Sequence, residues 1–275
     1  MPNHPVQSKL QFYLLGAPTI QRNGEVISNL PIKTQALLFY LAMTRQSHLR
    51  TTLATLLWGE LPEPSAVQST QGNPATARFT LLEHFHSNRY SAALHTDDAL
   101  WVDAVAFTEQ VVQIRNTSDH NALEQATQLY RDDFLAGFFV RNAPDFEAWQ
   151  LAQRDRLHEQ MVGALETLAY HWAAQHDSAH AVAVTRRLLA LEPWRETAHR
   201  QLMTLLVRSG QRDAALVQYE RCREALQAEL DVDPAADTTA LYEQIRAGEF
   251  GADPSDPPWP FLHHRTTTCP LQPHH

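Results

Sequence analysis

The sequence feature that most constrains the fold is an internal repeat in the second half of the chain. With a shift of 34 residues, the apolar and small positions of 165–188 fall on those of 199–222. The matched positions are Leu165, Leu168, Ala169, Trp172, Ala181, Val182 and Leu188 in the first copy, and His199, Leu202, Met203, Leu206, Ala215, Leu216 and Cys222 in the second. A repeat of this length cannot bury its apolar face alone, so neighbouring copies must stack.

The repeat predicts an all-helical second module built from helix pairs. A period of 34 residues is that of tetratricopeptide helix pairs. Ala181 and Ala215 are small enough to let paired helices approach closely, and Gly210 stands at the turn of the second copy, where the first copy has His176. Stacked pairs leave a concave face that commonly binds a peptide or a domain. Apolar spacing upstream predicts further helices over 105–114, 122–134 and about 145–176.

The first part of the chain has a different pattern, with strands before helices. Strand-forming runs at 10–15 and 18–22 precede Asn23-Gly24, a strong hairpin signal, and the chain returns over 25–27. Helical spacing then predicts helices from about 33 to 43 and from 49 to 58, the second ended by Gly59. A third helix is expected over about 75–85, with Phe79, Leu82 and Phe85 facing inward, and a second hairpin over 93–103, turning at Asp97-Asp98.

This order of elements is that of a winged helix with a small N-terminal antiparallel sheet. In such a module the second and third helices form a helix-turn-helix, the third helix fits the major groove, and the hairpin reaches the neighbouring DNA backbone. The alternative is a small α+β domain with no role in nucleic-acid binding. The fold class we expect is therefore mainly α: a winged helix followed by a tetratricopeptide-like helical domain.

Charge and composition limit the function further. The net charge of -9 argues against non-specific coating of nucleic acid but permits a small DNA-reading face. Residues 1–115 contain equal numbers of basic and acidic residues, so the remainder carries the whole net charge, which suggests two modules with different roles. No transmembrane helix or secretory signal is expected, and two cysteines suit a reducing cytoplasm, so we expect a cytoplasmic protein with no membrane partner.

Several motifs resemble those of a known family. They are FLAGF at 134–138, EAW at 147–149, RDRL at 154–157, LLALEPWRETAH at 188–199, ERCR at 220–223, ELDVDP at 229–234 and LYEQIR at 241–246. In this order, over about 105–249, they resemble the bacterial transcriptional activator domain. Upstream, Arg50, the run LATLLWGE at 53–60 and the dipeptide at 62–63 resemble the helix-turn-helix of the same family. Residues 10–249 are thus similar to the antibiotic-regulatory-protein (SARP) type of transcriptional activator.

The resemblance implies a domain order and partners. In that family a winged helix binds promoter repeats, and the helical domain assists dimer formation and contact with RNA polymerase. We therefore expect a disordered N-terminus (1–9), a winged-helix DNA-binding domain (10–103), a bacterial transcriptional activator domain (104–249) and a disordered Pro/His-rich tail (250–275). The family's third helix usually opens with Asn-Leu-Arg, whereas Arg78 is the only firm cation at this place here. ATP is not expected, because the chain has no Gly-rich loop with Gly-Lys-Ser/Thr.

The candidate DNA contacts are Lys33, Arg50, Arg78 and Arg89. We expect Arg78 to face bases and the other three to meet phosphates. The alternative hypothesis is an adaptor that no longer binds DNA and acts through its helical repeats. We predict no catalytic site and no cofactor. The His263-His264 and His274-His275 pairs around Cys269 could bind a metal, but a flexible Pro-rich tail is the favoured interpretation, so no metal site is predicted.

Overall fold

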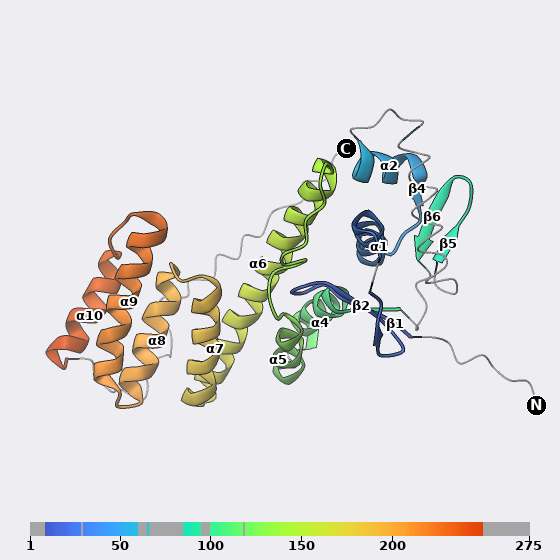
Figure 1. The fold of residues 1–275 in the computed structure, drawn as a ribbon. Coiled ribbons are helices and arrows are strands. Elements are labelled where there is room, and N and C mark those ends of the chain that lie inside the picture. Colours follow the sequence, from blue (N-terminus) through green and yellow to red (C-terminus); the bar gives the residue numbers. More distant parts are fainter. Residues whose placement is uncertain are drawn as a thin grey trace, which may run out of the picture. The chain divides into compact units, whose positions relative to one another are not determined.

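The computed structural model describes residues 9–28, 30–59, 65, 85–94, 100–117 and 119–249 (Figure 1). The chain divides into two compact units, Met1–Ala164 and Leu165–His275, and the division falls inside helix α6 (Pro144–Ala174). Apart from Lys9, both expected disordered segments lie outside the described residues, as do the tail histidines and Cys269. Of the helices described, none is long and apolar enough to cross a membrane.

The first unit contains a four-stranded sheet with the order β3-β2-β1-β7. Its strands are β1 (Leu10–Tyr13), β2 (Thr19–Arg22), β3 (Glu25–Val26) and β7 (Leu100–Val102). The expected hairpin at Asn23-Gly24 is confirmed, because β2 and β3 pair antiparallel and both turn residues have positive φ, 52° and 86°. In β1, Leu10 and Phe12 are buried while Gln11 and Tyr13 are half-buried, so one face of the sheet faces the core.

The expected second hairpin at Asp97-Asp98 is wrong. Strand β7 pairs parallel with β1, whereas β6 (Ser91–Leu94) lies in a separate three-stranded sheet between β4 (His48–Leu49) and β5 (Phe85–Ser87). Leu100 and Val102 are buried beside β1, and that burial fixes the partner of β7. The main sheet is therefore mixed rather than antiparallel, and the wing hairpin is β5–β6.

The third expected helix falls almost entirely on residues that the structure does not describe. Phe85, which was expected to face inward on that helix, lies instead in β5. Arg78, Phe79 and Leu82 are outside the described residues. The prediction of a recognition helix therefore stays a prediction.

The other helices of the first unit are close to expectation. The helices α1 (Ile32–Thr44) and α2 (Arg50–Trp58) confirm the first two predictions. After them come α4 (Asp103–Thr117) and α5 (His120–Leu129), whose N-cap is Asp119. Helix α5 ends before the expected Phe134, because Phe134 forms a β-bridge with Leu15 and Leu135 takes a φ of 53°, which is not helical.

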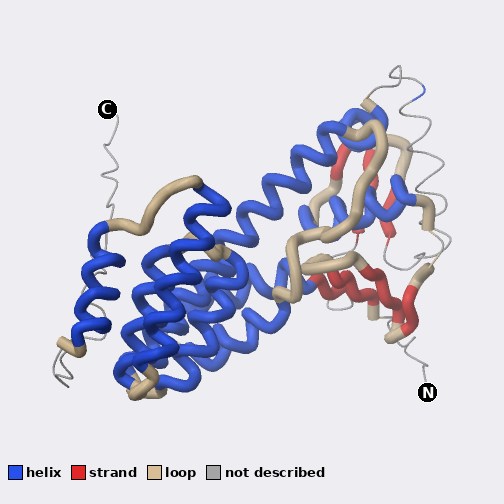
Figure 2. The backbone as a smooth tube through the Cα atoms, turned by 60° about the vertical axis from the view of Figure 1, so that its left-hand side comes forward, coloured by secondary structure: helices blue, strands red, loops and turns tan. Residues whose placement is uncertain are grey.

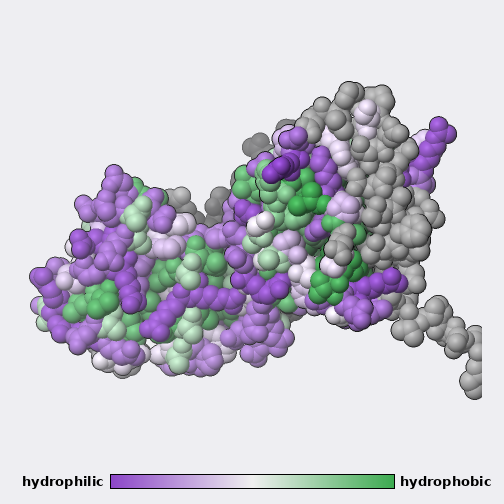
Figure 3. Space-filling view, viewed as in Figure 1, coloured by the Kyte–Doolittle hydropathy of each residue, from purple (hydrophilic) through white to green (hydrophobic). Residues whose placement is uncertain are grey.

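The second unit is all helix in its described residues. It contains the C-terminal part of α6, followed by α7 (Ser178–Leu191), α8 (Glu196–Arg208), α9 (Arg212–Leu230) and α10 (Ala236–Ala247), which lie side by side in both views (Figures 1 and 2). Ala181 and Ala215 are completely buried, as expected for helices in close approach. The face of this unit in Figure 3 is mostly hydrophilic with hydrophobic patches between, the pattern of amphipathic helices. The core contains Leu202, Met203, Leu206, Ala215, Tyr219, Leu241 and Ile245.

The repeat extends to the backbone of its turns. His176 and Gly210 occupy the same left-handed position, with φ values of 59° and 74°. In the first copy, the N–H groups of 176 and 177 donate to the carbonyls of 173 and 172, and in the second the N–H groups of 210 and 211 donate to those of 207 and 206. Every partner is shifted by 34 residues. Both turns are Schellman-type helix ends, so the sequence period is a structural one.

Candidate nucleic-acid interface

The turn of the wing hairpin is shaped by Asn88. Its Oδ1 accepts hydrogen bonds from the backbone N–H groups of Tyr90 (2.7 Å) and Ser91 (2.8 Å), and its own N–H donates to the Ser91 carbonyl (3.0 Å). An asparagine side chain that binds the backbone two and three residues on is a common way to fix a tight turn. Arg89 and Tyr90 are exposed on this turn, and the Arg89 guanidinium lies 5.8 Å from the centre of the Tyr90 ring.

Arg50 holds this turn against the start of α2. Its side chain is almost completely buried, with 8 % of the residue exposed, and its Nε donates to the Asn88 carbonyl at 2.9 Å. Its backbone N–H donates to the Tyr90 carbonyl at 2.8 Å. Burial lowers the pKa of Arg50 below its ordinary value, but an arginine keeps its charge in proteins. The residue expected to meet a phosphate is therefore engaged within the protein.

Lys33 lies at the opposite end of α2. Its Nζ donates to the Leu57 carbonyl at 2.6 Å and lies 5.3 Å from the centre of the Trp58 ring. A cation at a helix C-terminus interacts favourably with the helix dipole. The structure thus brings Arg50 and Arg89 together at the wing and places Lys33 in a helix-capping contact, while Arg78 is not described.

Sequence reasoning missed Asn88 and Tyr90. A signal was present: Ser87-Asn88 lies just before the run 91–94, and asparagine and serine are turn residues. The acidic dipeptide at 97–98 is also a turn signal, and the hairpin was predicted there. Tyr90, with 70 % of its surface exposed, is the most exposed of the large hydrophobic side chains described.

A buried carboxylate anchors the sheet to the helices behind the wing. Asp103 is 1 % exposed. It accepts hydrogen bonds from the N–H groups of Leu14 (2.7 Å), Leu15 (3.1 Å) and Ala104 (2.7 Å), and Arg131 pairs with it at 3.2 Å. Burial raises the pKa of Asp103, and the three N–H groups together with Arg131 counter that rise. The end of β1 is thereby fixed to the start of α4.

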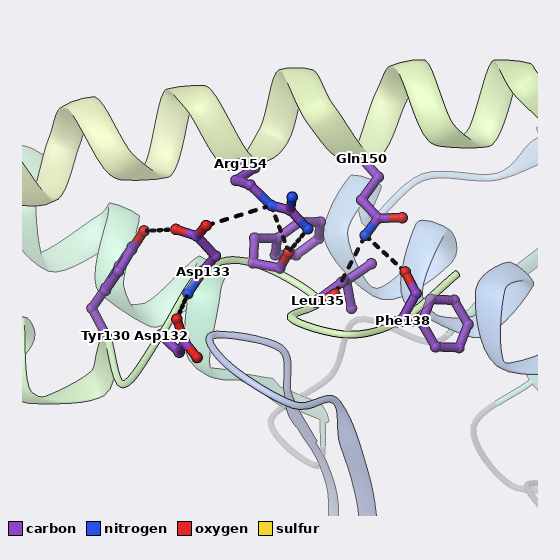
Figure 4. A network of polar contacts seen from close by, with 8 residues as sticks. Tyr130, Asp132, Asp133, Leu135, Phe138, Gln150 and Arg154 are labelled. Atoms are coloured by element: carbon purple, nitrogen blue, oxygen red, sulfur yellow. Dashed lines mark hydrogen bonds and ion pairs between the residues drawn. The ribbon is translucent and has the colours of Figure 1, made fainter. Parts of the chain in front are cut away.

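The loop 131–138 is held on α6 by two polar side chains (Figure 4). Gln150 donates from Nε2 to the carbonyls of Leu135 (3.3 Å) and Phe138 (3.2 Å). Arg154 donates to the Phe134 carbonyl from Nε (3.4 Å) and Nη2 (3.3 Å). These contacts give a physical reason why the motif at 134–138 occurs together with the arginine of the motif at 154–157: α6 supplies hydrogen-bond donors to the carbonyls of Phe134, Leu135 and Phe138.

Aromatic side chains join α1 to the same loop and helix. The rings of Phe39 and Phe138 lie 5.1 Å apart, and those of Tyr40 and Trp149 lie 5.0 Å apart, both edge to face. A surface ion pair between Arg45 and Glu109 adds a contact from the end of α1 to α4. The elements around the wing and the first helices after it therefore pack as one compact unit.

Comparison with protein families identifies the class of protein. Residues 102–246, more than half of the chain, match the bacterial transcriptional activator domain. The chain belongs to this family. The expected resemblance to SARP-type activators is confirmed at the level of family and fold.

A solved structure has the same fold. The chain resembles Mycobacterium tuberculosis EmbR, determined in complex with a low-affinity phosphopeptide, with a TM-score of 0.65 and 22 % sequence identity. The likeness covers 88 % of this chain and 66 % of the EmbR chain, so this chain spans just under two thirds of that structure's length. No curated protein matches the sequence significantly.

Proposed function

We propose that the chain regulates transcription by binding promoter DNA through the winged helix of the first unit, while the helical repeat binds a protein partner, RNA polymerase or a second copy of the chain. The observation that carries the DNA-binding half is the turn at Arg89-Tyr90. It presents an exposed cation and an exposed aromatic ring on a backbone that Asn88 and Arg50 hold in place. A preformed cationic turn of this kind suits the phosphate backbone beside a groove.

The four candidate residues take different roles in this proposal. Arg89 contacts a phosphate directly. Arg50 positions the turn, because its guanidinium already donates to Asn88, and Lys33 stabilises the end of α2. Arg78 reads a base, where a bidentate contact to guanine contributes about 1–3 kcal/mol of discrimination.

The test starts from selection of a binding sequence from a random duplex pool with the purified full chain. Fluorescence anisotropy of the selected duplex is then measured over a range of salt concentrations. Arg89→Ala should weaken binding to all duplexes alike and reduce the slope of log affinity against log salt by about 1. Arg78→Ala should reduce the preference for the selected duplex over a scrambled one.

The matched control is Arg156→Ala, which removes an exposed arginine of α6 whose described contact is a hydrogen bond to Gln153. It changes the net charge equally and should leave the slope unchanged. Unchanged binding by both the Arg78 and the Arg89 variants would contradict the proposal.

The adaptor remains the second candidate, and one observation favours it. Two of the expected DNA contacts, Lys33 and Arg50, donate to carbonyls of the protein itself. A protein of this kind would show a salt slope near zero for every duplex, because it neutralises no phosphates. The same anisotropy series therefore distinguishes the two functions.

A further inference from the structure

The second unit contains a pocket of about 260 Å³ between α7 and α9, with α8 at its base. Arg186 of α7 and Arg221 of α9 line it and are exposed, whereas His199 and Leu202 of α8 line it and are buried. The pocket is therefore a groove whose two sides carry one cation each. The functions proposed above give no role to the residues that line it.

The two arginines have no polar partner among the described residues. Within the described part of the chain, neither Arg186 nor Arg221 has an ion pair or a hydrogen bond, although neighbouring arginines do: Arg195 pairs with Glu166 at 2.7 Å, and Arg223 pairs with Glu220 at 2.9 Å. Acidic partners are thus used elsewhere in the unit but not at the groove. Two unpaired guanidiniums on opposite sides of one groove can each bind a carboxylate.

The walls between the arginines are apolar. They consist of Leu189, Ala190, Pro193, Leu202 and Ala225. A pocket of 260 Å³ with such walls is of a size for one large apolar side chain rather than for an extended cofactor.

The two buried polar residues of the pocket, His199 and Gln218, carry no charge. Nε2 of His199 lies 2.8 Å from the Pro193 carbonyl and so donates to it, which leaves Nδ1 to accept from Nε2 of Gln218 at 2.8 Å. Burial lowers the pKa of His199, in agreement with this neutral tautomer. Gln218 uses one N–H on His199, so its other N–H and its carbonyl remain for the backbone of a bound peptide.

We propose that this groove binds an acidic peptide segment of a partner protein, with an apolar side chain in the pocket and a carboxylate on each of Arg186 and Arg221. DNA is the poorer occupant, because a duplex backbone brings no apolar side chain to the Leu189–Pro193 wall. The inference rests on the partner-binding half of the proposed function and names the chemistry of that partner. Its test uses no DNA, so its failure leaves the DNA-binding half standing.

The experiment is a selection of phage-displayed random dodecapeptides on the full chain, run in parallel on the Arg186→Glu/Arg221→Glu variant. The wild-type chain should enrich peptides in which Asp or Glu flanks Leu, Phe or Trp, and the variant should not. The best enriched peptide is then synthesised with a fluorescein label and titrated by anisotropy. The double variant should raise its Kd about tenfold or more, because it replaces two attractions with two repulsions.

Two further variants separate charge from shape. Arg208→Glu changes an exposed arginine of α8 that does not line the pocket. On the ligand side, an analogue of the peptide with each glutamate replaced by glutamine tests the role of its charge. The first should leave Kd within about twofold, and the analogue should bind about tenfold more weakly. Ala190→Trp fills the groove from an exposed position of α7 and should weaken binding with no change of charge.

Equal enrichment on the wild-type chain and the double variant overturns the proposal. So does a Kd that Ala190→Trp leaves unchanged. Sedimentation of both proteins adds a third check: a wild-type dimer that the double variant converts to a monomer would make a second copy the occupant of the groove and overturn the peptide assignment.

Discussion

The carboxylate of Asp103 accepts a hydrogen bond of 2.7 Å from the backbone N–H of Leu14, which lies 89 positions earlier in the chain. This bond joins the residue that follows β1 to the first residue of α4. It lies at the place where the sequence motifs suggest a boundary between two domains. A buried connection crosses this place, and the two compact units of the structure divide inside α6.

Replacement of Asp103 tests this connection. Asp103→Asn keeps the size of the side chain but sets an amide N–H against one of the backbone donors, which leaves that donor buried without a partner. The free energy of unfolding should fall by about 2–3 kcal/mol in a urea titration. Glu159→Gln, a change at an exposed site on α6, is the control and should have little effect. Equal stability of both variants would show that the anchor contributes nothing.

Arg50 gives a test of direct contact against positioning. Arg50→Ala removes the hydrogen bond to Asn88, so amide hydrogen exchange of residues 85–94 should become faster in mass spectrometry. DNA binding should weaken while the salt slope stays constant, because no phosphate contact is lost. A slope reduced by about 1, with exchange unchanged, would instead identify Arg50 as a direct phosphate contact.

The equivalent turns of the repeat predict opposite effects for two substitutions. Gly210 has a φ of 74° with open space around its Cα, so Gly210→Ala should destabilise the protein by about 1 kcal/mol through backbone strain alone. His176 occupies the same conformation, so His176→Gly should stabilise it by a similar or smaller amount. Thermal unfolding of both variants measures this, and the same sign for both would contradict the equivalence.

His199 predicts a pH dependence of stability. Burial lowers its pKa in the folded protein below the ordinary 6.5, so the unfolded chain takes up the proton first as the pH falls. The contribution of the neutral imidazole is fully present above pH 6.5 and is lost as the pH falls from there toward the folded pKa. Urea titrations between pH 7.5 and 5 should show this loss, with a slope of at most about 1.4 kcal/mol per pH unit from this group.

The variant His199→Gln isolates that group, because it cannot titrate in this range while it retains an N–H donor. Its free energy of unfolding should be lower at pH 7.5, and its decline toward pH 5 should be shallower than that of the wild-type chain. A parallel decline in both proteins would assign the pH dependence to other residues.

The sequence by itself determined those features that depend on neighbouring residues. The hairpin at Asn23-Gly24, the limits of α1 and α2 and the 34-residue repeat are all carried by local spacing and turn chemistry, and the repeat is reproduced down to the turns at His176 and Gly210. These signals need no knowledge of what lies across the fold, because backbone preference and side-chain period act within a few residues.

Tertiary structure decided the rest. Residues 100–102 had the pattern of a strand, but this local pattern did not determine which strand they pair with. Packing beside β1 made the pairing parallel. Arg50 had the sequence context of a phosphate contact, yet its burial against Asn88 depends on a turn 38 positions away. Strand partners and the burial of charges are set by desolvation and packing between distant segments, and no local pattern encodes them.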